Sequence, residues 1–407
     1  MVKKIITILL VIIVGLGFLL QIDDELSEES KGLINRLEQT PLSEAYLFLL
    51  GINANKDQDP IQVGRELLAE IRKSELDESY EIEYFQGLKV ERPEPFFCQF
   101  SRPECLSGIF ATKLDSNAFL EGYSTLIERT DRFLNYTEYT TLTQPSINEY
   151  IPPFELLFVA QRLMIIKAIS LHQKGDSTSA MNLLSNNLSR VRQSMALQDN
   201  LIGKLVLLNT AADLVEVMSV IASQTSLDVA GIPKLTAQER SFHIIAAREF
   251  GLPYHYFKSL DRSPDLFQKE GNVPGWVTRI FFKPNMSINA LTPIYLQMEQ
   301  LSKMTAPEFA ESIRTSPSHD TSTSKFRNYM GDNLNISNPD FRPYIARTFD
   351  FDIRVAIFNQ RHVLKRPLEK MKNPYFGNET PKQVDGKLCF DGPMKDEKLF
   401  RCLTVNL

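Results

Sequence analysis

The feature that most constrains this chain is an apolar run that starts directly after two lysines. Lys3 and Lys4 are followed by sixteen residues without a charge, 5–20, and the run reaches Ile22 if Gln21 is included. Eighteen helical residues at a rise of roughly 1.5 Å each span about 27 Å, which matches the hydrocarbon layer of a membrane. The run therefore predicts a transmembrane helix.

A cleaved signal peptide begins in the same way, with basic residues before an apolar stretch. It should end at a small-x-small cleavage site, and the only candidate, Gly-Leu-Gly at 15–17, is followed by further apolar residues. We therefore favour an uncleaved anchor over a cleaved signal. The positive-inside rule keeps Lys3 and Lys4 in the cytoplasm and sends residues 23–407 across the membrane. The acidic residues that follow the run are interpreted as the first turn of a helix.

The exported part has the composition of an ordinary folded protein. Of the 407 residues, 43% are hydrophobic and 23% are charged, with 45 Lys and Arg against 50 Asp and Glu. These proportions exclude disordered, collagen-like and polytopic membrane proteins. The formal net charge of −5 also argues against nucleic acid as a partner, because the neutralisation of phosphates needs a basic face.

The four cysteines form two close couples, Cys98 with Cys105 and Cys389 with Cys402. Four cysteines allow three connectivities, and the sequence alone does not choose between them. Pairing within each couple is favoured because each brackets a turn, and an oxidising compartment agrees with the predicted topology. A zinc site is the alternative, but C-x6-C and C-x12-C differ from the usual zinc knuckles and no histidine lies nearby. The sequence predicts two disulfides and no metal.

Helical patterns dominate the exported part of the chain. The strongest block predicts three successive antiparallel helices over residues 154–173, 177–195 and 200–223, and the third is apolar enough to be buried on most sides. Gly175 and Ala180 suit the tight turn and close approach of a tetratricopeptide-like αα-hairpin. The pattern occurs once, so an ordinary helical hairpin is favoured over a repeat domain. Stacked hairpins form concave protein-binding surfaces.

Other regions have weaker patterns. Residues 80–110 lose the helical period, and residues 252–342 are the least regular part. A capping box predicts a helix over residues 237–250, which Gly251 and then Pro253 should end.

Two short apolar runs near the C-terminus, residues 387–390 and 399–405, predict a β-hairpin clipped by the second cysteine couple. The expected fold class is mainly α, with an N-terminal transmembrane helix, an α-helical extracytoplasmic domain of tetratricopeptide-like hairpins, and a small disulfide-clipped C-terminal β-hairpin. We expect four parts along the chain, namely the cytoplasmic tip and anchor (1–22), an N-terminal helical region with the Cys98/Cys105 loop (23–145), a central helical-hairpin domain with an irregular aromatic segment (146–342), and a C-terminal helix and hairpin (343–407).

The sequence contains no motif that predicts catalysis or cofactor binding. The five histidines have no metal-binding spacing, and there is no GxSxG and no glycine-rich phosphate loop. Ser322-x-x-Lys325 matches the SxxK pattern of penicillin-binding enzymes by its letters alone, without the accompanying KTG. We therefore predict no catalytic residue, no metal ligand and no cofactor.

Two proline-bounded aromatic segments are the remaining candidates for a ligand groove. Residues 253–257 and 275–285 combine aromatic rings with polar groups, as the walls of ligand pockets do. The simpler interpretation, which we favour, is that these non-helical segments cover the helical core and keep one polar tip in water. If there is a site, its candidate residues are His255, Trp276, Arg279 and Asn285.

Several stretches resemble a group of single-span, membrane-anchored envelope proteins of Gram-negative bacteria. They are the short N-terminal anchor, GDSTSAMNLLSNNLSRVRQSM with NLIGKLV in the helical block, FFKPNMSINA, and the C-terminal NPYFGNETPKQVDGKLCFDGP. The resemblance covers about half of the chain in patches, and none of its motifs has an assigned catalytic role. It implies a single-pass protein of the bacterial inner membrane with residues 23–407 in the periplasm.

Three functional hypotheses remain open. The leading one is a membrane-anchored periplasmic scaffold that acts by binding another envelope protein. The alternatives are an envelope hydrolase with an unrecognised site near His255 and Arg279, and a small-molecule or lipid-binding protein that uses the aromatic residues of 276–282. The expected partners are the membrane and an envelope protein, and an enzyme is the less favoured class.

Overall fold

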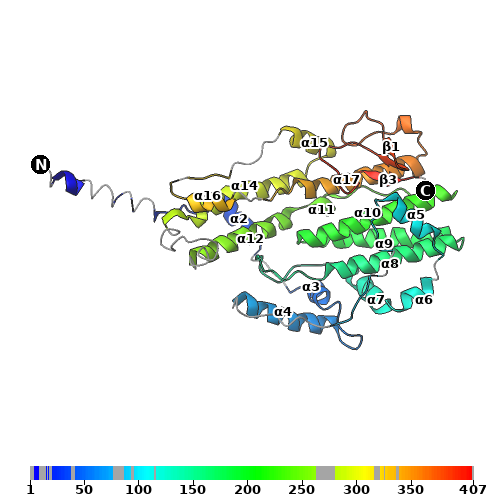
Figure 1. The fold of residues 1–407 in the computed structure, drawn as a ribbon, viewed down its shortest axis with the longest axis horizontal. Coiled ribbons are helices and arrows are strands. Elements are labelled where there is room, and N and C mark those ends of the chain that lie inside the picture. Colours follow the sequence, from blue (N-terminus) through cyan, green and yellow to red (C-terminus); the bar gives the residue numbers. More distant parts are fainter. Residues whose placement is uncertain are drawn as a thin grey trace.

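The computed structural model shows a mainly helical protein with a small antiparallel sheet near its C-terminus (Figure 1). The predicted fold class is confirmed to this extent. The structure describes residues 4–8, 15, 17, 21–37, 42–76, 87–92, 96–113, 116–262, 280–315, 321–324, 326–335 and 339–405.

Three long helices form the centre of the protein, and each packs against the other two. They are α8 (Phe154–Gln173), α9 (Ser177–Leu197) and α10 (Leu201–Gln224), which agree with the predicted block within two residues. Gly175 has a positive φ of 88° in the turn between α8 and α9, a conformation that glycine adopts readily. The α8–α9 hairpin repeats, if at all, with the start of α10, which lies 47 residues after the start of α8. This spacing is longer than the roughly 34 residues of a tetratricopeptide unit.

Helix α10 is, among the described residues, the one helix long and apolar enough to cross a membrane. However, 78% of its apolar window is buried inside the protein. It also carries Lys204 and Glu216, whose side chains are surrounded by protein at 1% and 0% exposure. Helix α10 is therefore the core helix of the folded body. The predicted N-terminal span, residues 5–22, lies largely outside the described residues.

The N-terminal helices pack on this centre. Helix α3 (Glu44–Leu50) is almost entirely buried, and α4 (Pro60–Leu76) packs closely against it. Gly64 permits this contact, because a Cβ there would lie 1.8 Å from the carbonyl oxygen of Leu47. Three further helices precede the centre, namely α5 (Pro103–Ala111), α6 (Ser116–Glu121) and α7 (Ser124–Phe133).

Helix α12 corrects the prediction for the region around His255. The predicted capping box is present, but the helix that it opens, α11 (Ala237–Arg240), has only four residues. Helix α12 (His243–Arg262) begins shortly afterwards and continues through Pro253. Residues 253–257, expected to be a non-helical cover over the core, are therefore helical.

Close packing explains why Gly251 does not end this helix. A Cβ at Gly251 would lie 2.8 Å from Leu37 and 2.9 Å from Pro145, so the glycine serves the contact between elements. Phe250 and Phe257, on either side of Pro253, are buried and hold α12 against its neighbours. The free energy of this packing offsets the loss of the backbone hydrogen bond that proline cannot donate.

Helix α14 (Pro284–Ser302) packs along α12, and α2 (Glu28–Asn35) contacts both. Helix α17 (Arg342–Phe358) lies against α10 and against the C-terminal sheet. The other helical elements among the described residues of this half are α15 (Ala306–Thr315), α16 (Tyr329–Asn335), a π-helical turn (Asn359–Val363) and a 3-10 turn (Leu368–Lys370).

Both predicted disulfides are confirmed. Cys98 bonds to Cys105, and Cys389 bonds to Cys402, which leaves no free cysteine. Cys389 and Cys402 lie opposite each other in the predicted hairpin. The sheet has three short antiparallel strands in the order β1 (Lys382–Val384), β2 (Lys387–Cys389) and β3 (Cys402–Thr404).

Candidate functional site

The predicted ligand-binding residues do not form one group in the described part of the chain. Trp276 and Arg279 lie outside the described residues. His255 on α12 lines a cleft of about 730 Å³, whereas Asn285 on α14 is not part of its wall. The two described candidates therefore have different surroundings.

Asn285 holds the segment that follows the predicted anchor. Its side-chain Nδ2 donates to the carbonyl oxygen of Asp24 at 2.7 Å, and its backbone N–H donates to the carboxylate of Asp23 at 2.8 Å. Its Oδ1 accepts a hydrogen bond from Lys258 at 2.7 Å. Both polar atoms of the side chain are thus engaged within the protein, and these contacts describe a structural role.

The cleft at His255 is lined by both polar and apolar side chains. Burial and the nearby charge of Arg262 lower the pKa of the His255 imidazole, and burial raises the pKa of the Glu75 carboxyl on the same wall. Arg248, also on the wall, pairs with Glu149 and donates to the carbonyl oxygen of Thr143. Burial also raises the pKa of the Asp199 carboxyl in this cleft, so burial shifts one imidazole and two carboxyls toward their neutral forms.

A second cavity, of about 520 Å³, is lined by both disulfide loops, residues 98–105 and 389–402. We call it the loop cavity. Its lining also includes residues of α8, α10 and α17, which connect it to the helical core. The loops contribute six residues, namely Gln99, Phe100, Ser101, Glu397, Lys398 and Phe400.

Buried arginines hold both loops against the helical core. Arg162 of α8 donates to the carbonyl oxygen of Cys98 at 3.0 Å. Arg354 of α17 donates to the carbonyl oxygens of Leu399 at 2.7 Å and Phe400 at 3.1 Å. Each loop is thus fixed twice, by its own disulfide and by a guanidinium from a helix.

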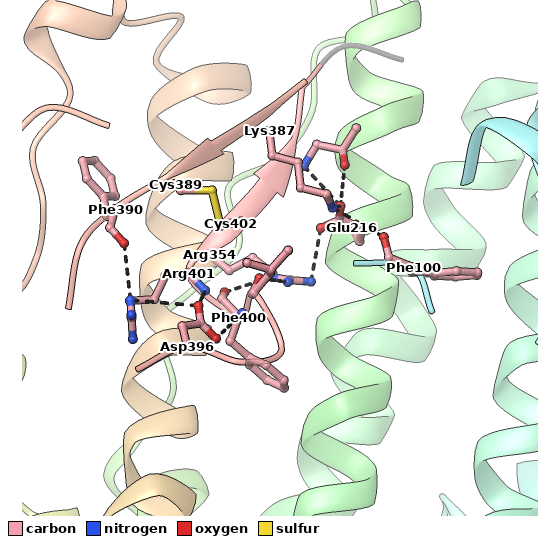
Figure 2. The surroundings of a disulfide bond; sticks show 12 residues. Phe100, Glu216, Arg354, Lys387, Cys389, Phe390, Asp396, Phe400, Arg401 and Cys402 are labelled. Atoms are coloured by element: carbon pink, nitrogen blue, oxygen red, sulfur yellow. Dashed lines mark hydrogen bonds and ion pairs between the residues drawn. A yellow bond between two sulfur atoms is a disulfide. The ribbon is translucent and has the colours of Figure 1, made fainter. Parts of the chain in front are cut away.

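Glu216, fully buried on α10, links these contacts into one network (Figure 2). Its carboxylate pairs with Lys387 of β2 at 2.5 Å and with Arg354 at 3.2 Å, and it accepts from the Thr404 hydroxyl at 2.5 Å. Lys387 also donates to the carbonyl oxygen of Phe100 in the first loop at 3.4 Å. Because an unpaired charge is costly at this depth, the carboxylate and the two cations require one another.

The loop cavity offers the half-buried ring of Phe158 and two side-chain amides, those of Gln99 and Asn209. The Arg162 guanidinium lies 3.5 Å from the ring centroid of Phe100 and 5.1 Å from that of Phe158. The half-buried Asn209 side chain forms no hydrogen bond with any residue that the structure describes. The lining holds three basic and three acidic side chains, so its formal charge cancels. The Phe158 ring and the two amides are therefore uncharged groups that a ligand can contact.

The sequence prediction missed this cavity. Its only signal in the sequence is the presence of charged residues inside apolar helices, such as Arg162, Glu216 and Arg354. In the sequence, each of these residues is an isolated charge in an apolar pattern. They come close together only because helices that are distant in the sequence pack against one another.

Known proteins provide no identification. The chain matches no protein-family model, no curated protein and no solved structure. Within the described ranges, no group of three or more His, Cys, Asp or Glu side chains could hold a metal ion. The function has to be argued from the geometry of the two cavities.

Proposed function

We propose that this protein is a membrane-anchored, periplasmic helical protein that binds another cell-envelope protein in its loop cavity. The observation that carries the proposal is the double fixation of both loops, by disulfides and by Arg162 and Arg354. A surface that is already rigid loses little conformational entropy on binding. This geometry suits recognition by the two loops together.

The disulfides and the apolar N-terminal run support the compartment. Disulfides persist mainly outside the cytoplasm, and every cysteine of this chain is in one. Within the apolar run, Ile5, Ile6 and Ile8 are 52% to 60% exposed on the folded protein. Exposed isoleucines in succession favour contact with lipid over contact with water.

The lining favours a partner segment with uncharged side chains. Arg162 and Arg354 already donate to loop carbonyls, and the charges of the lining cancel. The half-buried ring of Phe158 can pack on an apolar side chain, while the Asn209 amide can pair with a peptide group. A volume of about 520 Å³ accommodates a short peptide segment.

Site-specific crosslinking in intact cells tests the partner. A photoreactive phenylalanine at Gln99 or at Lys398, both exposed at the cavity, should yield the same adduct with one envelope protein. The matched control is Arg65, exposed on α4, where that adduct should not form. Recovery of the protein without any adduct at Gln99 and Lys398, or with equal adducts at all three positions, would overturn the proposal.

A reporter fusion tests the compartment. An enzyme that is active only outside the cytoplasm, fused after Leu407, should be active in cells. Activity of a cytoplasm-only reporter at the same position would overturn the periplasmic location.

A second candidate function is a small-molecule or hydrolytic site in the His255 cleft. It is favoured by one observation, the opposite pKa shifts of His255 and Glu75, which both move toward neutrality on one wall. A thermal-shift screen of small molecules should then find a ligand for the wild type that His255→Ala no longer binds. If His255→Ala responds to every ligand as the wild type does, this function is excluded.

A further inference from the structure

The segment that follows the predicted anchor, residues 22–30, is bound to the folded body over its whole length. Backbone carbonyls in this segment accept hydrogen bonds from side chains that are distant in the sequence. The three donors are Arg327 to Ile22 at 2.7 Å, Asn285 to Asp24 at 2.7 Å and Asn289 to Glu25 at 2.8 Å. We call this set of contacts the juxtamembrane clamp.

The clamp also caps helix α14. The N-cap residue of this helix, Lys283, forms no side-chain cap. Instead, the carboxylate of Asp23 accepts from the backbone N–H groups of Asn285 at 2.8 Å and Met286 at 3.2 Å. A carboxylate at this position satisfies N–H groups that lack partners and interacts favourably with the helix dipole. A residue 262 positions away therefore completes the start of α14.

Asn289 continues the clamp one helical turn further along α14. Its Oδ1 accepts from the N–H of Ser27 and from the hydroxyl of the buried Ser30, both at 2.9 Å. Ser27 is in turn the N-cap of α2, so α2 begins in contact with α14. No free linker remains between residue 22 and the body, and the point where the chain leaves the body is fixed.

Two exposed aromatic residues lie next to the arginine that holds this point. Arg327, which holds Ile22, lies beside Phe326 and two residues before Tyr329. The side chains of Phe326 and Tyr329 are 82% and 56% exposed, and Ile22 is 56% exposed. Phenylalanine is usually buried, so this degree of exposure marks a surface that contacts something apolar. Aromatic rings beside an arginine are typical of the membrane–water interface.

We propose that Ile22, Phe326, Arg327 and Tyr329 form a membrane-docking face, with the two aromatic rings inserted between lipid headgroups and acyl chains. This inference rests on the proposed N-terminal anchor. A transmembrane helix that ends at Ile22 without a linker brings this face to the bilayer, which is why we assign it to lipid. Arg327 pairs with Asp24 at 3.2 Å, which neutralises its charge. Exposed acidic residues follow Asp24 in the chain, namely Glu25, Glu28 and Glu29. The face therefore favours zwitterionic over anionic lipids.

Docking by this face also orients the rest of the molecule. In Figure 1, α2 and α16 lie toward the end of the body that is nearer the N-terminus, while β1, β3 and α5 lie toward the opposite end. The disulfide loops belong to these latter elements. The loop cavity is thus held away from the membrane, where a partner protein can reach it.

Tryptophan quenching by brominated lipid tests the docking face. The full-length protein, with its single tryptophan replaced by Trp276→Phe, is placed in vesicles of phosphatidylcholine brominated on the acyl chains. Phe326→Trp in this background should lose emission relative to unbrominated vesicles. The matched control is Val384→Trp on β1, a site that is 51% exposed at the opposite end and should keep its emission.

Co-flotation with the vesicles distinguishes this inference from the proposed anchor. If the protein floats with the vesicles and Phe326→Trp keeps its full emission, the docking face is wrong and the anchor stands. If the protein does not float, both are wrong. A second variant, Asn289→Ala, loosens the clamp and should reduce quenching at position 326 without changing flotation. Unchanged quenching in that variant would overturn the role of the clamp.

Discussion

The two ends of the folded body are held by different chemistry. At the end that bears the docking face, amide and hydroxyl groups such as those of Asn289 and Ser30 make most of the contacts, at sites that water partly reaches. At the opposite end, two disulfides enclose a fully buried network of Glu216, Lys387 and Arg354. Both ends fix a segment of chain without regular structure, and they do so by separate means.

Because of this difference, substitutions at the two ends should have different effects on stability. A neutral hydrogen bond contributes about 0.5–1.5 kcal/mol, and such bonds can be lost one at a time. In a buried charge network, the loss of one member leaves the others without compensation, at a cost of about 3–5 kcal/mol. We therefore expect the end with the disulfide loops to fail as a unit and the clamp to loosen in steps.

The largest expected effect is that of Glu216→Ala. It leaves the ammonium of Lys387 and the guanidinium of Arg354 buried without their carboxylate, which should lower the free energy of unfolding by about 3–5 kcal/mol. Urea denaturation measures the loss. The control is Glu397→Gln, which removes an exposed partner of Lys395 and should leave the midpoint unchanged. Equal midpoints for the two variants would show that the network tolerates a missing charge.

Removal of the disulfides should have the next largest effect. In the chain-entropy model, serine at Cys389 and Cys402 costs about 3 kcal/mol for a loop of about 14 residues. The same change at Cys98 and Cys105, with a loop of about 8 residues, costs about 2.5 kcal/mol. Denaturation of the two double variants compares these losses. If either variant unfolds at the wild-type midpoint, the arginine contacts alone are sufficient to hold that loop.

The bundle of α2, α12 and α14 should respond to acid. Burial alone would raise the pKa of Glu299, but hydrogen bonds from Lys303, Arg36 and His243 lower it to about 2. Since the folded pKa lies below the ordinary value of 4.5, the stability that this carboxylate contributes is complete above that value and is lost as the pH falls toward 2.

Glu299→Gln isolates this contribution. Urea midpoints of the variant and the wild type should differ most near about pH 6 and converge near about pH 2. Glu311→Gln, an exposed change on α15, should follow the wild type throughout. If the urea midpoints of Glu299→Gln and the wild type differ by the same amount at every pH in this range, the lowered pKa of Glu299 is contradicted.

The smallest expected effect is local. Asn289→Ala removes three hydrogen bonds, with the N–H of Ser27, the hydroxyl of Ser30 and the carbonyl of Glu25, and should cost about 2 kcal/mol. Hydrogen exchange should accelerate in residues 22–30 and stay unchanged in α10. Asn333→Ala, an exposed amide on α16, serves as the control. Faster exchange in α10 as well would mean that the clamp is part of the same cooperative unit as the core.

The parts of the fold that could be predicted depend on local information. The boundaries of α8, α9 and α10 follow from their apolar pattern and from the caps Asp176 and Asn200, which both accept from their own helices. The acidic first turn of α2 is confirmed at Glu28 and Glu29. The hairpin and its disulfide follow from the spacing of a turn between two cysteines. Such signals lie within a few residues of the element that they define.

The parts that could not be predicted depend on distant contacts. Gly251 resembles a helix end in the sequence. The structure shows that glycine is needed there because Leu37 and Pro145 pack against it and leave no room for a Cβ. Asp23 resembles one more acidic residue of a first turn, although it caps a helix that starts at Pro284. The network at Glu216 likewise unites residues from four elements. No local pattern contains these pairings.

The capping of α14 by Asp23 also sets an order of events during synthesis. Residues 22–30 are made early, whereas α14 lies about 260 residues further along the chain. At about 5–20 residues per second, roughly 13–50 seconds pass before α14 has been made. During this interval Asp23 cannot meet Asn285 and Asn289, so the segment lacks these partners. The contacts of Asp23 with Asn285 therefore form only after the start of α14 has been made.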